Sequence, residues 1–183
     1  VLMAKLHDAG LFRLLLPRDF GGAEIALPAF FQVIEELAKH DASTAWCVCQ
    51  NNGCAAMAAY LDPEAAEEIW GRDPRAVLAW GPGKAEARAV EGGYSVNARC
   101  AYVSGGRHAS WFGAHCAVFE RDGSVRRNAG GEPELRTVLF PAHLAPMTDN
   151  WDVIGLRGTG SDAFEVKNLF VPENHTAVRE WGP

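Results

Sequence analysis

The sequence predicts an α+β protein, in which an N-terminal all-α helical domain at residues 1–75 precedes an antiparallel β-barrel or sandwich at residues 76–183. Two observations predict this class. The apolar residues repeat with a helical period up to about residue 75 and with a period of two after it. The helical and the strand-like segments also form two separate runs, without the β–α–β alternation of a doubly wound sheet.

The first helices are expected at residues 2–9 and 30–38. The first segment ends at Gly10, a residue type that favours the position after a helix. In the second segment, apolar residues recur at positions i, i+3, i+4, i+7 and i+8, and polar residues fill the other face. Pro28 suits the start of this helix, because its fixed φ is compatible with a first turn.

Two further helices complete the predicted helical domain. Residues 43–60 are apolar nearly all round and predict a central buried helix, with Asp41 or Ser43 as its cap. Gly53 in this helix costs up to ~1 kcal/mol relative to alanine, which suggests the close approach of another helix or of a ligand. The last helix is indicated by Asp62-Pro63, an N-cap followed by a proline in the first turn.

After residue 75, the alternation of apolar and polar residues predicts strands. The clearest strand runs from Tyr94 to Val103 and follows a turn at Gly92-Gly93. Further strands are expected at residues 76–80, 113–120, 136–140 and 163–171. The Gly-, Asn- and Glu-rich residues 122–134 are typical of an exposed hairpin or loop.

The composition is that of an ordinary globular protein, and it excludes several functional classes. Of the 183 residues, 48% are hydrophobic, which is enough for a sizeable core. The formal net charge of −6 offers no basic face, so we expect no nucleic-acid partner. No apolar run approaches the roughly 20 residues of a membrane-spanning helix, so we expect no membrane partner. The chain starts at Val1 within a helical pattern, and we expect it to be part of a longer protein.

The five cysteines form no Cys-x-x-Cys pair and lie in apolar or strand-like segments. We expect them to be reduced and buried in a cytoplasmic protein, in preference to a disulfide framework or a metal site. His108, His115 and Cys116 are close in sequence, but their spacing matches no zinc signature. Because neighbouring residues of a strand point to opposite faces, His115 and Cys116 would not share a metal. We therefore expect no metal site.

Known catalytic motifs are absent in their standard form. Gly81-Pro82-Gly83-Lys84 lacks the Ser or Thr of a P-loop, and the glycines of residues 155–160 do not follow the Rossmann order. No Gly-x-Ser-x-Gly elbow supports a hydrolase. Glycine-rich turns are still able to hold a phosphate or the edge of a flavin through backbone N–H groups, although a role in the turn alone is the simpler explanation.

Aromatic and hydroxyl side chains gather at the ends of the predicted strands. They are Trp80, Tyr102, Trp111, Trp151, Ser104, Thr159 and Ser161. Core packing explains each aromatic residue taken alone. Together, these side chains would form a flat, partly apolar cleft with a few hydrogen-bond donors, which is typical of a site for a planar heteroaromatic cofactor.

Several motifs resemble those of the acyl-CoA dehydrogenase superfamily. Residues 16–22 and 41–46 are similar to its opening segments, and residues 151–161, with a strand ending in Val171-Pro172, are similar to its middle-domain signature. The resemblance implies an N-terminal helical domain, a middle β-barrel and a C-terminal four-helix domain, with flavin between the last two. Because the chain stops where the barrel ends, we expect the four-helix domain to be absent and this fragment alone to be inactive.

Departures from the dehydrogenase pattern favour one branch of the superfamily. Dehydrogenases usually carry T-E-P-x-x-G-S-D where this chain has Trp80-Gly81-Pro82-Gly83, and residues 102–105 with His108 and Trp111 look more like the two-component flavin monooxygenases. This branch implies reduced FAD or FMN from a separate reductase, an aromatic or polycyclic substrate, and a homotetramer at full length. An FAD-dependent acyl-CoA dehydrogenase and a non-catalytic, truncated binding module remain the alternatives.

The resemblance also assigns roles to individual residues. Ser104 is the expected catalytic residue, because a hydroxyl near flavin N5 or O4 stabilises negative charge that develops there. The expected cofactor-binding residues are Trp80, Pro82, Gly83, Tyr102, Val103, Ser104, Gly105, Arg157, Thr159 and Ser161. Arg157 would pair either with a phosphate or with an acidic neighbour. The expected substrate-binding residues are Asn51, Asn52, His108 and Trp111.

Overall fold

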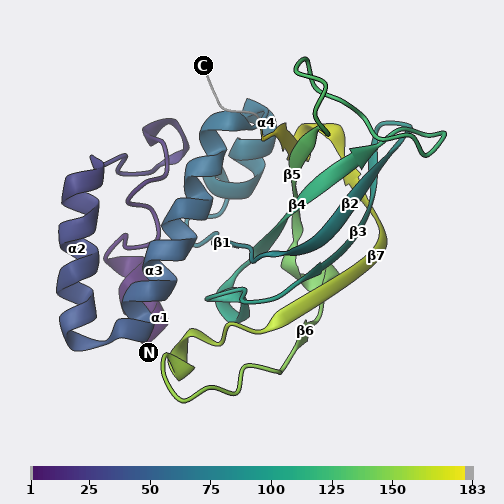
Figure 1. Cartoon of the computed structure of the whole chain (residues 1–183). Helices are drawn as coiled ribbons and strands as arrows, with labels where there is room; N and C mark the ends of the chain where they lie inside the picture. Colours follow the sequence, from purple (N-terminus) through teal and green to yellow (C-terminus); the bar gives the residue numbers. More distant parts are fainter. Residues whose placement is uncertain (1, 180–183) are drawn as a thin grey trace.

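A computed structural model describes residues 2–179 and places a group of helices beside a curled sheet (Figure 1). The helices are α1 (Leu2–Asp8), α2 (Leu27–His40), α3 (Ala42–Ala55) and α4 (Pro63–Ala66), with 3₁₀ or π turns at Arg18–Phe20, Ala56–Tyr60 and Glu67–Gly71. The strands are β1 (Leu78–Ala79), β2 (Gly83–Val90), β3 (Gly93–Cys100), β4 (Trp111–Phe119), β5 (Leu135–Pro141), β6 (Met147–Thr148), β7 (Ala163–Pro172) and β8 (Thr176–Val178). Helices therefore precede strands, as the sequence predicts.

Helix α3 begins at the predicted cap and lies between α2 and the sheet, but it is buried only in part. Asp41 Oδ1 accepts a hydrogen bond from the backbone N–H of Thr44 at 2.6 Å, and the hydrogen bonds to Thr44 lower the pKa of this carboxyl. One side of α3 packs against α2, while Trp46 on another side is 45% exposed. A Cβ at Gly53 would meet no atom within 4 Å, so no other helix approaches closely there. Val48, Cys54 and Ala55 of α3 are buried in hydrophobic clusters, so only part of this helix faces open space.

The eight strands form one sheet in the order β6-β7-β3-β2-β4-β5-β8, with β1 beside β4. The predicted α+β class is confirmed, but the expectation of an antiparallel sheet is wrong in part. Strand β4 lies parallel to both β1 and β2. After the β2–β3 hairpin, the loop at residues 101–110 carries the chain back across the sheet. Strand β4 therefore joins the free edge of β2 and runs in the same direction.

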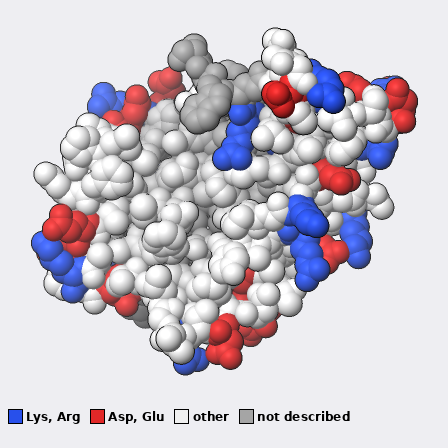
Figure 2. Space-filling view, in the orientation of Figure 1, with Lys and Arg blue, Asp and Glu red and all other residues white. Residues whose placement is uncertain are grey.

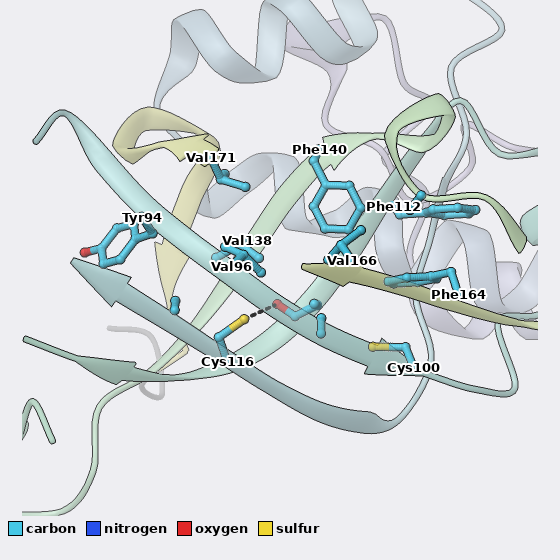
Figure 3. Close-up of a cluster of buried hydrophobic side chains, with 14 of the residues drawn as sticks. Tyr94, Val96, Cys100, Phe112, Cys116, Val138, Phe140, Phe164, Val166 and Val171 are labelled. Carbon is cyan, nitrogen blue, oxygen red and sulfur yellow. Dashed lines mark hydrogen bonds between the residues drawn. The ribbon is translucent and has the colours of Figure 1, made fainter. Parts of the chain in front are cut away.

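Three phenylalanine rings show how strongly the sheet curls. The Phe112 ring of β4 stacks on Phe164 of β7 with centroids 4.8 Å apart, and Phe140 of β5 meets the same ring edge-on at 5.8 Å. Because β7 and β4 are separated in the sheet by β3 and β2, these contacts require the sheet to close around one face. Figure 3 shows the resulting core, in which apolar side chains from β3, β4, β5 and β7 point toward one another.

A second buried cluster attaches the helices to the sheet. Ile69 and Trp70, in the turn after α4, pack with Leu16 and with Leu139 of β5.

All five cysteines are free thiols, and burial raises the pKa of Cys54 to about 12. Across residues 2–179, none of the helices has the length and apolar character needed to cross a membrane.

Candidate functional site

A cleft of about 660 Å³ opens between α3, the β1–β2 connection and the loops that follow β3 and precede β7. It brings together seven of the residues predicted from the sequence: Trp80, Pro82, Gly83, Tyr102, Ser104, Thr159 and Ser161. In Figure 2, most charged side chains lie around the margin of the visible face, and the surface between the helices and the sheet is largely uncharged. The cleft lining is likewise mainly aromatic, small or hydroxyl-bearing.

Three hydroxyl groups in the cleft wall form one directed chain of hydrogen bonds. Thr159 Oγ1 donates to the carbonyl oxygen of Leu156 at 2.9 Å, so its oxygen accepts from Ser161 Oγ, 2.7 Å away. Ser161 has then used its proton, and Ser104 Oγ, at 2.8 Å, donates to Ser161. Trp46 Nε1 in turn donates to Ser104 Oγ at 2.9 Å. Because each hydroxyl carries one proton, the bonds are consistent with one order of donors that runs from Trp46 to the Leu156 carbonyl, although Ser104 Oγ also lies 3.5 Å from the Tyr102 carbonyl oxygen.

This order changes the expected role of Ser104. We expected its hydroxyl to offer a proton to a ligand, but the proton is directed to Ser161. A ligand oxygen or nitrogen at Ser104 would receive that proton at the loss of the bond to Ser161, unless the chain reversed so that Ser161 donated to Ser104 and Thr159 donated to Ser161. The reversal gives up the bond from Thr159 to the Leu156 carbonyl. The cleft can therefore switch Ser104 from an inward donor to a donor toward a ligand.

Two lining residues, Tyr102 and Leu156, have left-handed backbone conformations that disfavour side chains, with φ of 56° and 53°. The neighbouring structure holds both in place. The carbonyl of Tyr102 accepts from Ser104 N at 2.9 Å, and that of Leu156 accepts from Trp151 Nε1 at 3.1 Å and from Thr159. Tyr102 and Trp151 also meet edge-on, 5.8 Å between ring centroids. Strained residues that are held in this way cluster at functional sites.

A buried carboxylate, Asp162, holds the cleft loops together. Its Oδ2 accepts from Arg107 Nε at 2.6 Å, and its Oδ1 accepts from the backbone N–H groups of Asn150 and Trp151. Burial raises the pKa of this carboxyl, but the hydrogen bonds from Arg107 and the two N–H groups outweigh that effect, so that the pKa is lowered. The Asp162 carbonyl also accepts from Val103 N, which fixes the segment that carries Ser104. No pattern in the sequence had singled out this residue.

Val103 and Gly105 flank Ser104 without lining the cleft. Val103 is fully buried in the sheet core. Gly105 has a φ of +72°, and a Cβ there would lie 2.5 Å from Asn51 Oδ1, so only glycine fits. Both residues therefore lie where they set the backbone that carries the Ser104 hydroxyl.

Asn51 and Asn52, predicted to contact a substrate, lie outside the cleft and are buried. Asn51 Nδ2 donates to the carbonyl oxygens of Leu78 and Ser104, at 3.1 and 3.3 Å. Asn52 binds the backbone of residues 11–15, accepting at 2.8 Å from one N–H and donating at 2.7 Å to one carbonyl. Their amides satisfy backbone groups that lack partners in regular structure, which is the usual role of buried polar side chains.

Three other predicted residues also lie away from the cleft lining. His108 is exposed in a short 3₁₀ turn. Trp111 stacks on His175 with ring centroids 5.5 Å apart, at the edge of the second core. Arg157 is exposed and forms no ion pair with any residue of the described range 2–179. Within the same range, no group of three or more His, Cys, Asp or Glu is arranged to hold a metal ion.

Several lining residues were not predicted from the sequence. Trp46 and Gln50 lie on α3, one helical turn apart, and both line the cleft. His115 and Leu135 come from the neighbouring strands β4 and β5. The i, i+4 spacing on α3 was a usable signal, whereas the strand residues are brought in by long-range pairing. Trp151 had been noted among the aromatic residues at strand ends and as the start of the middle-domain motif, but not as a site residue.

Comparison with known proteins adds an independent observation. Residues 1–70 match the family described as acyl-CoA dehydrogenase, N-terminal domain. The chain is 35% identical over 175 residues to HsaA, the oxygenase subunit of a flavin-dependent monooxygenase from Mycobacterium tuberculosis, with 92% of this chain and 41% of HsaA covered. It is 34% identical over 181 residues to the indole-3-acetate monooxygenase of Pseudomonas putida, with 98% of this chain and 43% of that enzyme covered.

A solved structure gives the same result for the fold. The chain superposes on XiaF from Streptomyces sp., in complex with FADH2 and glycerol, with a TM-score of 0.85 and 27% identity, over 96% of this chain and 43% of XiaF. The chain thus spans less than half the length of the proteins that it matches. The resemblance that the motifs indicate, including the one to the flavin-dependent monooxygenases, is confirmed.

Proposed function

We propose, from the premise that this chain belongs to the acyl-CoA dehydrogenase superfamily, that it is the flavin-site half of the oxygenase component of a two-component monooxygenase. One observation carries the proposal. The Ser104 hydroxyl lies in a largely uncharged cleft with aromatic walls, and its proton is directed by a switchable chain. We further propose that residues 1–75 and 76–183 act as the helical and barrel domains of that protein.

The residues of the cleft fit a flavin. Trp80, Tyr102 and Trp151 offer flat apolar surfaces to a fused ring, and Ser104 offers a hydrogen bond. The turn at residues 81–83 leaves one side of the cleft without bulky side chains. The cleft of about 660 Å³ is of the size that small-molecule and cofactor sites have.

The proposed reaction is the hydroxylation of an aromatic substrate. When bound, reduced flavin supplies the two electrons with which O₂ is split, so that one oxygen atom enters an aromatic C–H bond and the other leaves as water. Ser104 is the residue that would donate a hydrogen bond at the reactive edge of the ring, with its oxygen accepting from Ser161, and Ser161 from Thr159, when the chain reverses. Trp46 fixes the other side of the Ser104 oxygen.

Three features of the whole protein belong to the same proposal. A separate reductase supplies reduced FAD or FMN, as the description of HsaA as an oxygenase subunit suggests. The substrate is aromatic, as in the relative named for indole-3-acetate. The full-length protein is a cytoplasmic homo-oligomer, in line with the superfamily pattern.

Mixing the full-length protein with reduced flavin and ¹⁸O₂ tests the proposal. We expect one labelled oxygen atom in a hydroxylated aromatic product and the other in water. If instead acyl-CoA compounds reduce bound FAD and no labelled product forms, the chain belongs to a dehydrogenase. If full-length protein with intact fold binds no flavin in any redox state, it is a non-catalytic binding module.

A further inference from the structure

A second cavity of about 590 Å³ adjoins the cleft and shares four of its lining residues, Trp80, His115, Leu135 and Arg179. Its floor is the exposed backbone of Gly53 on α3, where a Cβ would meet nothing within 4 Å. Met57 and Tyr60, from the same helical segment, form an apolar wall. The space over Gly53 is therefore open on the helix side, apolar beside Met57 and Tyr60, and in contact with the cleft at its other end.

The end shared with the cleft is polar. His115 Nδ1 lies 2.9 Å from Thr137 Oγ1, and the His115 ring meets the edge of Trp80 with centroids 4.9 Å apart. Arg179 lines the same end and forms no ion pair with another residue of the range 2–179. A histidine and an arginine thus converge where the two cavities meet.

The hydrogen bond to Thr137 fixes which nitrogen of His115 carries the proton. Thr137 is 1% exposed, and within the described chain its hydroxyl has only His115 Nδ1 as a side-chain partner. A buried hydroxyl whose proton has no acceptor costs free energy, so Thr137 donates to Nδ1. The neutral ring then has its proton on Nε2, the nitrogen not engaged by Thr137. Burial, and next the charge of Arg179, lower the pKa of His115 to about 4, so the ring is neutral near pH 7.

We propose that this second cavity binds the aromatic substrate and that His115 Nε2 and Arg179 recognise an acidic oxygen on it, of a phenol or of a carboxylate. The apolar wall at Met57 and Tyr60 takes the ring, and the polar end orients it toward the cleft. This inference rests on the proposed function, because it assigns the substrate of the same site. An oxygen of the flavin is the other possible source of this chemistry, and the experiment below separates the two.

Binding of three matched compounds to the full-length protein tests the proposal. 2-Naphthol and 2-naphthoate carry the two kinds of acidic oxygen, and 2-methylnaphthalene carries none. Their fluorescence gives dissociation constants without turnover. We expect at least one of the first two to bind ten-fold or more tightly than 2-methylnaphthalene, and the tighter of the two identifies the group recognised.

Substitutions test whether His115 and Arg179 cause the preference for the compounds with an acidic oxygen. His115→Phe keeps the ring packing on Trp80, and should abolish the preference while leaving the binding of 2-methylnaphthalene unchanged. Arg179→Gln should weaken 2-naphthoate binding several-fold. Because Arg179 is exposed, this substitution should not affect folding. Gly53→Leu fills the cavity and should weaken all three compounds ten-fold or more. His143→Phe, on an exposed loop, is the matched control and should change nothing.

The outcomes separate this inference from the proposed function. Equal binding of the three compounds by the parent protein, or a preference that survives both His115→Phe and Arg179→Gln, overturns the subsite. A His115→Phe or Arg179→Gln variant that loses affinity for reduced flavin but keeps the naphthol preference also overturns it, because the oxygen recognised by that residue is then the flavin's. By contrast, a parent protein with the expected preference that incorporates no ¹⁸O leaves the subsite standing and contradicts the proposed function.

Discussion

The indole N–H of Trp46, on α3, donates a hydrogen bond of 2.9 Å to the hydroxyl oxygen of Ser104, in the loop after β3. The two residues are 58 positions apart in the chain. This bond joins the helical part of the protein to the loop that carries the proposed catalytic hydroxyl. Asn51, on the same helix, also binds the Ser104 carbonyl. Helix α3 therefore positions both the backbone and the side chain of Ser104, and helix packing sets the geometry of the cleft.

Replacing Trp46 by phenylalanine should remove the hydrogen bond that holds the Ser104 hydroxyl, while an aromatic ring still lines the cleft. The variant loses one hydrogen bond worth about 0.5–1.5 kcal/mol, so we expect the ratio of hydroxylated product to hydrogen peroxide to fall roughly 2- to 10-fold. Ser104→Ala should lower the same ratio more, by about 10²- to 10³-fold, because it removes a preorganised donor. Trp111→Phe, a tryptophan outside the cleft, is the control. Equal ratios for the Trp46 variant and this control would contradict the positioning role.

The sequence patterns predicted most helices and strands because local periodicity decides them, but they missed β2. In this strand Lys84, Glu86 and Arg88 alternate with alanines, and the alanines face the sheet core or lie partly buried. Alanine is a poor strand former, so the alternation alone did not indicate a strand against the Gly-Pro-Gly turn before it. The parallel pairing of β2 with β4 also could not be predicted from local patterns, because strand order depends on contacts between residues distant in sequence.

The candidate site was predictable where its residues share a local motif. Ser104, Thr159 and Ser161 were selected as hydroxyls next to glycines, and the fold does bring them together. Asn51 and Asn52 show the opposite case, because a polar residue in an apolar helix has the same pattern whether it faces a ligand or an unpaired backbone group. The geometry of pairing, which no local pattern contains, decides between the two.

Arg107 should stabilise the fold mainly through the buried carboxylate of Asp162. Arg107→Met leaves that carboxylate with backbone donors only, and we expect the free energy of unfolding near pH 7 to fall by more than in the control variant below, although the arginine is itself half exposed. Urea unfolding measures this loss. Arg157→Met, an exposed arginine, should change the value by less than about 0.5 kcal/mol.

The same pair predicts a dependence on acid. The folded state lowers the pKa of Asp162, so its contribution is present above the unfolded value of about 3.9 and is lost as the pH falls below it. The difference between the parent protein and Arg107→Met should therefore shrink between about pH 4 and pH 2. A difference that stays constant down to pH 2 would show that Arg107 acts through another contact.

His115 should destabilise the folded protein in mild acid. Its pKa of about 4 lies below the ordinary value of 6.5, so the unfolded chain binds a proton in this range and the folded chain does not. The free energy of unfolding should fall as the pH drops from about 6.5 to about 4, by less than about 1.4 kcal/mol per unit because the ring is only partly buried. Thermal unfolding across this range should show a shallower slope for His115→Gln than for the parent. The control His143→Gln should keep the parent's slope.

Gly53 gives a prediction in the opposite direction, toward higher stability. It lies inside α3, where glycine is about 0.8–1.0 kcal/mol less favourable than alanine, and a Cβ there would meet no atom within 4 Å. Gly53→Ala should therefore raise the free energy of unfolding by about 0.5–1 kcal/mol, measured by urea unfolding. Gly22→Ala is the contrasting variant, because its Cβ would overlap the carbonyl of Leu16 and should destabilise the fold. If Gly53→Ala also proves destabilising, the space over this residue is filled, and the floor assigned to the second cavity is wrong.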